Sequence, residues 1–285
     1  MPDLEAIVSA VASSKKYRAI CEDTIRRIAG RELAHHDSAK AAIKATKRRL
    51  HQVYGAFEQD FDYEAAYREL ESAYRTGSAA GIRKACWQIL DQHSSTRERL
   101  SIVDRFYPAI FSVTGRPASI LDLGCGLNPL ALPWMDLPAA ARYIALDIDS
   151  ARIAFLNRYL ALAGLEPLAR CQDLLAHPPD DPADVAFLLK MSPSLERQEP
   201  GATLRLIDRL RAPSIVVSFA VKSLGGREKG MVEHYQRQVS AWIEERGWAV
   251  DELVFETELV FVVERQRIGR IGGSSVPRGR NEGNP

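Results

Sequence analysis

The stretch ILDLGCGLNPLALP, residues 120–133, places an acidic side chain just before two glycines that are separated by one residue. Asp122 belongs to an apolar run typical of a buried strand, and Gly124 and Gly126 follow where the chain must turn and let a ligand approach its backbone. A dinucleotide-binding GxGxxG turn would need a third glycine where Pro129 stands, and proline lacks the N–H that a pyrophosphate would use. The missing N–H and the negative charge of Asp122 both disfavour an anionic ligand. They favour a zwitterionic ligand with an amino group and a sulfonium, namely S-adenosylmethionine.

Two more acidic residues end the next two apolar runs. Asp147 comes 21 residues after Gly126, and a carboxylate there can accept from both hydroxyls of a ribose, although NAD-dependent enzymes use the same device. Asp173 ends the following run and could accept from the amino group of an adenine. Acidic residues at three successive strand ends favour a nucleoside-containing cofactor over a bare glycine turn.

The elements that must position these residues alternate between strands and helices from residue 118 onward. The predicted strands lie at 118–123, 142–148, 168–175, 184–190 and 213–219, and helices are expected at 128–133, 150–163, 195–211 and 231–247. Residues 248–265 read as two strands that pair antiparallel through a turn near Glu256–Glu258. The pattern predicts an α/β, Rossmann-like fold with a doubly wound, mostly parallel sheet and a C-terminal antiparallel pair.

The first 113 residues contain helical patterns and no convincing strand. Ser38 is a candidate N-cap for a helix that Gly55 closes. Further helices are expected at 62–76, 78–91 and 94–112. We therefore predict a helical N-terminal domain over residues 1–91, a methyltransferase domain over 92–265 and a disordered tail over 266–285.

The composition of the 285 residues, 46% hydrophobic and 26% charged, is that of an ordinary globular protein, without the run of about 18 apolar residues that a membrane-spanning helix needs. The opening MPDLEAIVSAVASSKK is not typical of a secretory signal. Cys21, Cys86, Cys125 and Cys171 lie far apart without a CxxC pair. We therefore expect a cytoplasmic protein that binds no structural metal and contacts no membrane.

The net charge is only +1, but the positive charge is unevenly distributed. Residues 13–51 hold eleven Lys and Arg against four Asp and Glu. The helix expected after Ser38 collects cations on the face opposite its apolar residues, and these are Lys40, Lys44, Lys47 and Arg48. Such a face suits a polyanionic substrate, although a merely solvated helix would have the same pattern.

A second basic stretch at 218–231 favours the polyanion. It leaves the end of a predicted parallel strand, at the edge where doubly wound folds bind their ligands. Among its three glycines it carries Lys222, Arg227 and Lys229. Lys190 ends the preceding strand of the predicted sheet and should face the same edge.

Motifs that the sequence lacks exclude some classes of methyl acceptor. Methylation of an exocyclic amine usually goes with an Asn/Asp-Pro-Pro-aromatic turn after the fourth strand, where this chain reads LLKMSPS. Methylation of a pyrimidine at carbon 5 needs a nucleophilic cysteine, commonly followed by proline, and none of the four cysteines is. Guanine N7 and adenine N1 remain, because each has a free lone pair. A small-molecule methyltransferase and an inactive RNA-binding fold are further alternatives.

Five segments also carry a family resemblance. They are SKKYRAICEDTIRRI, HSSTRERL, ILDLGCGLNPLALP, SFAVKSLGGREKGM and ELVFVVER. They resemble blocks of the aminoglycoside-resistance 16S rRNA methyltransferases, which modify guanine 1405 at N7, and the resemblance runs from about residue 13 to 265. It implies a helical extension that docks on rRNA, the assembled 30S subunit as substrate, and resistance to 4,6-disubstituted deoxystreptamines such as kanamycin and gentamicin. We also expect a monomer. The tail at 266–285 departs from the family, and we expect it to be inert.

The resemblance also implies roles for particular residues. The cofactor would be held by Phe57, His93, Ser94, Ser95, Arg99, Gly124, Asp147, Asp173, Leu174, Leu189 and Gln198, with Arg99 as partner of the methionine carboxylate. Lys190 and Arg227 match positions tied to catalytic activity, and we expect both to hold target RNA rather than to transfer protons. RNA docking would use Lys15, Lys16, Arg18, Lys40, Lys44, Lys47 and Arg48, together with Lys222 and Lys229.

Overall fold

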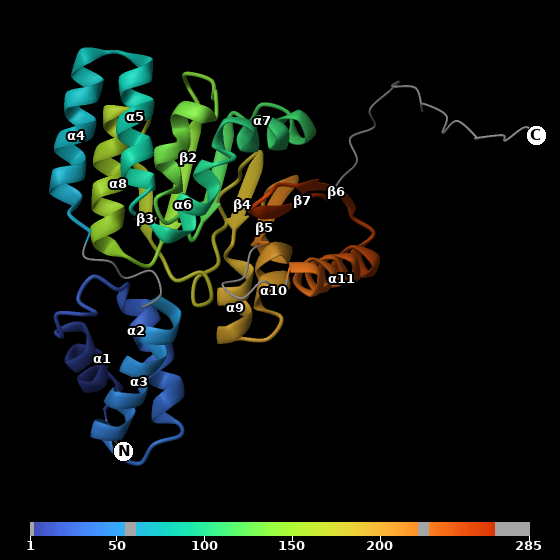
Figure 1. The fold of residues 1–285 in the computed structure, drawn as a ribbon. Helices are drawn as coiled ribbons and strands as arrows, with labels where there is room; N and C mark the ends of the chain where they lie inside the picture. Colours follow the sequence, from blue (N-terminus) through green and yellow to red (C-terminus); the bar gives the residue numbers. More distant parts are fainter. Residues whose placement is uncertain (1–2, 55–60, 222–227, 266–285) are drawn as a thin grey trace, which may run out of the picture.

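The computed structural model describes residues 3–54, 61–221 and 228–265 and contains a seven-stranded sheet in the order β3-β2-β1-β4-β5-β7-β6 (Figure 1). The strands are β1 (Ser119–Leu123), β2 (Arg142–Asp147), β3 (Leu168–Cys171), β4 (Val185–Leu189), β5 (Ser214–Ala220), β6 (Ala249–Val254) and β7 (Glu258–Glu264). Strands β1 to β5 are parallel, β7 runs antiparallel to β5, and β6 antiparallel to β7. The predicted sheet and its C-terminal antiparallel pair are confirmed.

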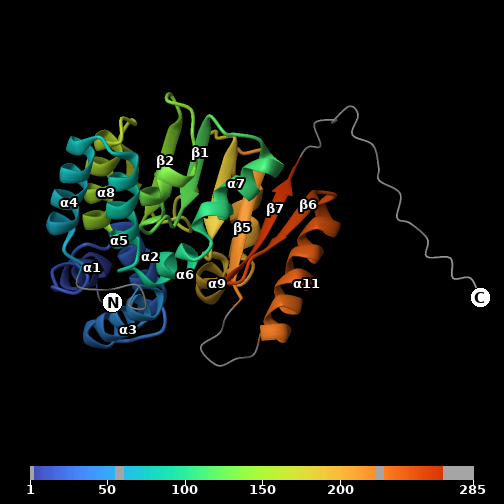
Figure 2. The same cartoon turned by 45° about the horizontal axis from the view of Figure 1, so that its top comes forward.

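Helices cover both faces of this sheet (Figures 1 and 2). One face packs against α4 (Tyr63–Thr76), α5 (Ala79–Leu90), α7 (Val103–Thr114) and α8 (Ser150–Leu162), and the other against α9 (Ser192–Gln198), α10 (Ala202–Arg209) and α11 (Glu228–Arg246). Alternate residues of each strand enter the two cores: Tyr143 points to the first, and Ile144 to the second. None of the helices in these ranges is both long and apolar enough to cross a bilayer.

Three predicted helices differ from the structure. The helix expected at 94–112 is divided into α6 (Ser94–Leu100) and α7, because Ile102 leaves helical geometry and is buried. The helix expected at 195–211 begins earlier and is divided into α9 and α10 at Gly201, which has a φ of +73°. The helix expected after the glycine turn is the 3-10 helix η1 (Asn128–Trp134), in which Pro133 has no N–H to donate.

The N-terminal helices α1 (Leu4–Ala12), α2 (Glu22–Leu33) and α3 (Ala39–Tyr54) form a small bundle with its own core. Ser38 caps α3 as predicted, accepting from the N–H of Ala41 at 3.3 Å. The helices α4 and α5, in contrast, share the core of the sheet. The division into domains at residues 91 and 92 stays a prediction, and this packing favours a boundary after α3.

The bundle is attached to the sheet beside the end of β2. The N–H of Cys21 donates to the carbonyl of Ile148 at 2.7 Å, and the N–H of Ser150 donates to the carbonyl of Ala19 at 2.7 Å. These bonds form a short antiparallel bridge between the connection that precedes α2 and the loop that follows Asp147. The seating of the bundle is therefore tied to the chain segment that carries a predicted cofactor residue.

Asn157 of α8 gives a test of how the edge strand β3 is held. Its side-chain amide donates to the carbonyl of Ala169 and accepts from the N–H of the same residue, both at 2.9 Å. Asn157→Ala leaves the N–H and the carbonyl of Ala169 without their hydrogen-bond partner. We therefore expect the free energy of unfolding to fall by about 1–3 kcal/mol in urea denaturation. The exposed Glu166→Ala is the control and should change it by less than ~0.5 kcal/mol. Equal stability of Asn157→Ala and wild type would contradict this account of the edge.

Candidate active site

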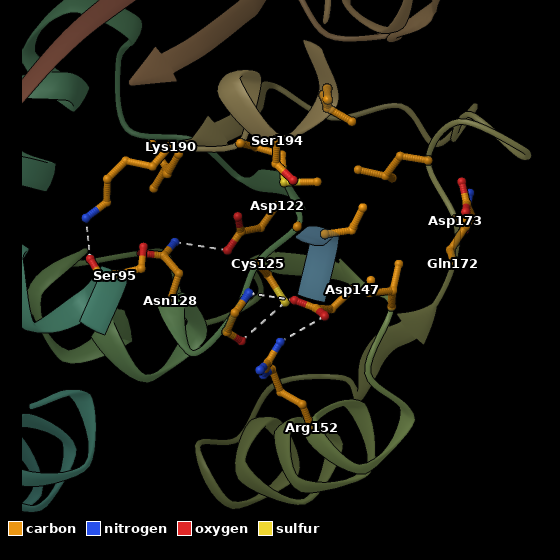
Figure 3. Close-up of a pocket in the computed structure, with 18 of the residues that line it drawn as sticks. Ser95, Asp122, Cys125, Asn128, Asp147, Arg152, Gln172, Asp173, Lys190 and Ser194 are labelled. Carbon is orange, nitrogen blue, oxygen red and sulfur yellow. Dashed lines mark hydrogen bonds and ion pairs between the residues drawn. The ribbon is translucent and has the colours of Figure 1, made fainter. Parts of the chain in front are cut away.

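A cavity lies at the carboxyl ends of β1 to β4, where doubly wound folds bind ligands (Figure 3). Most of the predicted cofactor residues line it, namely His93, Ser95, Arg99, Gly124, Asp147, Asp173, Leu174, Leu189 and Gln198, and so do Asp122 and Lys190. Ser94, the first residue of α6, is not part of the lining. Phe57 lies outside the described residues.

The glycine turn after β1 is required by backbone conformation and by space. Gly124 and Gly126 have φ values of +63° and +53°, which L side chains rarely adopt. A Cβ on Gly124 would also lie 2.5 Å from the sulfur of Met191. The N–H of Gly126 donates to Oδ2 of Asp147 at 2.9 Å. The turn thus brings the ends of β1 and β2 together, as the sequence predicts.

Asp147 is held by an arginine that the sequence analysis missed. Its Oδ1 accepts from the N–H of Asp149 at 3.1 Å and from Nη1 of Arg152 at 2.9 Å (Figure 3). Arg152 is buried in the first turn of α8, on the side of that helix that faces the core. These contacts leave an acceptor position on Oδ2, beside the bond from Gly126. A charged residue within an apolar stripe was the one sequence signal that could have indicated Arg152.

Asp173 is held by a second missed arginine, which comes from the N-terminal bundle. Oδ1 of Asp173 accepts from the N–H groups of Leu175 and Ala176, and Oδ2 accepts from Nη2 of Arg27 at 2.8 Å. Nη2 of Arg27 also donates to Oε1 of Gln198 at 2.8 Å. Burial raises the pKa of Asp173, but the charge and hydrogen bonds of Arg27, together with the N–H of Ala176 and the hydroxyl of Thr24, outweigh burial, so that its pKa lies below the usual value. Asp173 is therefore an ionised acceptor.

Arg99 belongs to a buried polar network beneath the glycine turn. It donates through Nε and Nη2 to both oxygens of Glu258, at 3.0 and 2.7 Å, and through Nη1 to Oδ1 of Asn128 at 2.9 Å. Asn128 in turn donates to Oδ2 of Asp122 at 2.9 Å, as does the hydroxyl of Tyr143 at 2.7 Å. At least three of the five N–H donors of Arg99 are thus used within the protein.

Lys190 lies at the rim of the cavity with its backbone in the left-handed region. Its φ is +57°, and its N–H donates to the carbonyl of Ser218 at 3.0 Å. The ammonium group contacts the carbonyl of Ser95 and lies 2.8 Å from Oε2 of Glu98. Burial lowers its pKa. A lysine held in a costly conformation at a strand end is typical of a functional position.

The structure describes His93 in full, but it describes only part of the basic stretch at 218–231. His93 lines the cavity, and burial lowers its pKa to about 4, which keeps the ring neutral at pH 7. Lys222 and Arg227 lie outside the described residues, and of Lys229 only the backbone, in α11, is described. In the described ranges no group of three or more His, Cys, Asp and Glu residues could hold a metal ion.

The predicted RNA-docking residues of the bundle form one surface, which we call the basic surface. It consists of Lys15, Lys16, Arg18, Lys40, Lys44, Lys47 and Arg48, all of them exposed except the half-buried Lys47. Nζ of Lys16 lies 3.2 Å from Nδ1 of His51, and the hydroxyl of Tyr17 donates to the carbonyl of Lys47 at 2.9 Å. The two basic segments, far apart in sequence, therefore lie side by side.

Asp122 gives a pH-dependent test of the network. Burial raises its pKa to about 6, although hydrogen bonds from Asn128 and Tyr143 act in the opposite direction. Between about pH 4 and 6 the folded protein keeps a proton that the unfolded chain has released, so this carboxyl lowers stability as the pH rises. Relative to Asp122→Asn, the wild type should lose up to about 3 kcal/mol of unfolding free energy between pH 4 and 7. Denaturant unfolding of both proteins measures this, and a difference that does not change with pH would contradict it.

The sequence of this chain is similar to those of ribosomal RNA methyltransferases. The model of a family described as "Ribosomal RNA methyltransferase (FmrO)" matches residues 13–262. The 16S rRNA (guanine(1405)-N(7))-methyltransferase of Frankia casuarinae is 41% identical over 266 residues, which cover 92% of this chain and 94% of that protein. The enzyme of the same name from Micromonospora echinospora is 38% identical over 265 residues, which cover 92% and 97%.

A solved structure with the same arrangement also holds a product of the predicted cofactor. The crystal structure of the 16S rRNA methyltransferase RmtF in complex with S-adenosyl-L-homocysteine has a TM-score of 0.79 and 33% sequence identity, covering 93% of this chain and all of that one. The predicted fold, the cofactor S-adenosylmethionine and the enzyme class are thereby confirmed. With a family model over residues 13–262 and a relative 41% identical over nearly its whole length, this chain belongs to the FmrO family of ribosomal RNA methyltransferases.

Proposed function

We propose that this chain methylates N7 of guanine 1405 in the 16S rRNA of the assembled 30S subunit. The relatives from Frankia and Micromonospora are named for that position. One observation in this chain carries the proposal: the cofactor cavity lies where the sheet meets the bundle that bears the basic surface. A small-molecule methyltransferase would need the cavity but not the surface. A methylated, cationic N7 would disrupt the binding of 4,6-disubstituted deoxystreptamines such as kanamycin and gentamicin, so resistance to them follows.

The residues around the cavity fit S-adenosylmethionine. The cationic amino group and sulfonium suit the buried Asp122, and a ribose hydroxyl suits the open position on Oδ2 of Asp147. The adenine amino group suits Asp173, and the methionine carboxylate suits the guanidinium of Arg99, which lines the cavity. When bound there, the cofactor supplies an electrophilic methyl group.

The part played by the protein is positioning. Guanine N7 carries an in-plane lone pair and no proton, so the transfer needs no general base and depends on alignment and on the exclusion of water. Lys190 stands at the rim with a fixed backbone and a partly desolvated ammonium group, and we assign it to the target nucleotide. We assign Arg227 to the target RNA as well. A ribosomal substrate implies action in the cytoplasm, and the monomeric state stays a prediction.

Methyl transfer to ribosomal subunits tests the proposal directly. Purified protein, labelled S-adenosylmethionine and 30S subunits from a susceptible strain should give labelled 16S rRNA. Borohydride reduction and aniline cleavage, followed by primer extension, should then give a stop at guanine 1405. Label on an adenine, together with protection of cells against apramycin, would identify the adenine-N1 reaction instead. Label on small acceptors but not on 30S subunits would overturn the proposal.

The basic surface predicts a charge-dependent loss of activity. Lys44→Glu/Arg48→Glu reverses two exposed charges of α3. It should weaken binding to 30S subunits by about tenfold or more at low salt, because contacts between cations and phosphates supply much of the affinity for nucleic acid. Calorimetry with S-adenosylmethionine should be unaffected. Arg68→Glu/Lys84→Glu makes the same charge change at exposed positions of α4 and α5 and serves as the control. Equal loss in both double variants would mean that α3 has no special part in docking.

A further inference from the structure

Arg27 is the only one of the arginines discussed above that reaches the cavity from the N-terminal bundle. Its side chain is only 12% exposed, and that of Asp173 is 2% exposed. The guanidinium binds both oxygens of Asp173, with Nε at 3.2 Å from Oδ1 and 3.0 Å from Oδ2. The same group donates to Gln198. Arg27 therefore joins two residues on different elements, the loop after β3 and the helix α9.

The guanidinium also fixes the polarity of both partners. Arg27 has only donors, so the ionised Asp173 must remain an acceptor and Gln198 must turn its side-chain oxygen toward the arginine. Nε2 of Gln198 then points away from Arg27 and lies 3.3 Å from the carbonyl of Ser194, which leaves it a second N–H to donate. The cavity wall thus presents the anionic carboxylate of Asp173, which favours a donor on the ligand, beside a donor from Gln198.

An acceptor beside a donor matches adenine and not its 6-oxo analogue. Adenine carries a donor amino group at C6 and acceptor nitrogens on either side of it. Hypoxanthine carries an acceptor oxygen at C6 and a donor N1–H, so its oxygen would face the carboxylate of Asp173. A site with fixed, buried polar groups rejects an analogue of reversed polarity, because those groups are left unpaired.

We propose that Arg27 is a positioning residue which makes the cofactor site selective for adenine, by holding Asp173 as acceptor and Gln198 as donor. This inference rests on the proposed binding of adenine at Asp173. Since Arg27 belongs to α2, the bundle takes part in cofactor recognition in addition to presenting the basic surface. Thr24 of α2 and Val53 of α3 also line the cavity, so the bundle forms part of its wall.

Calorimetry with two ligands tests the proposal on the full-length chain. The ligands are S-adenosyl-L-homocysteine and S-inosyl-L-homocysteine, and the measured quantity is the ratio of their dissociation constants. The wild type should prefer the adenosyl ligand by tenfold or more, on the order expected for mismatched buried polar groups. In Arg27→Ala the preference should fall to about threefold or less. Arg27→Lys keeps the positive charge but not the planar set of N–H donors that binds two oxygens at once, and should give an intermediate ratio.

Arg26→Ala is the matched control, since Arg26 is the neighbouring residue and is paired on the surface with Glu5 and Glu22. It should keep the wild-type ratio. A ratio is independent of the fraction of protein that is folded, so a destabilised Arg27→Ala still reports selectivity, and Arg27→Gln provides a second variant of similar size. The inference is overturned if the wild type prefers the adenosyl ligand and both Arg27→Ala and Arg27→Gln keep that preference in full. The cofactor assignment would then still stand. If the wild type binds neither ligand, the proposed function itself fails.

Discussion

The site depends on carboxylates that are buried away from bulk water, and three of them are each paired with an arginine. The pairs are Asp147 with Arg152, Asp173 with Arg27 and Glu258 with Arg99. An unpartnered buried carboxylate would cost several kcal/mol or take up a proton. The arginine offsets part of that cost and, because its donors are fixed in a plane, also sets the direction of the acceptor oxygens. The chemistry of the site is therefore specified by pairs of residues rather than by single ones.

The three arginines come from three parts of the chain. Arg152 lies in the first turn of the helix after β2, Arg99 lies on α6, and Arg27 lies in the N-terminal bundle. The short bridge between residues 19–21 and 148–150 seats that bundle beside Asp147. The bundle is thus structurally continuous with the site, and α3, which carries part of the basic surface, also contributes Val53 to the cavity wall.

The sequence predicts well what depends on local patterns. The acids at 122, 147 and 173 meet because parallel strands end at a common edge, and the glycine turn follows from its two residues with positive φ. The break at Ile102 was missed because it depends on the burial of that residue, which a helical period does not reveal, whereas the break at Gly201 has a local signal in the pair Pro200–Gly201. The partner of Asp173 was missed because Arg27 lies 146 residues away, and no spacing in one sequence links two such residues.

The antiparallel direction of β7 places its first residue at the site. Glu258 lies opposite Ala220, the last residue of β5, and so reaches the carboxyl edge where Arg99 stands. A growing chain that has not yet added β7 carries Arg99 without its counter-charge. The counter-ion of a residue made early in synthesis is thus supplied by the last strand of the described sheet, so that the network cannot be complete before β7 has been synthesised.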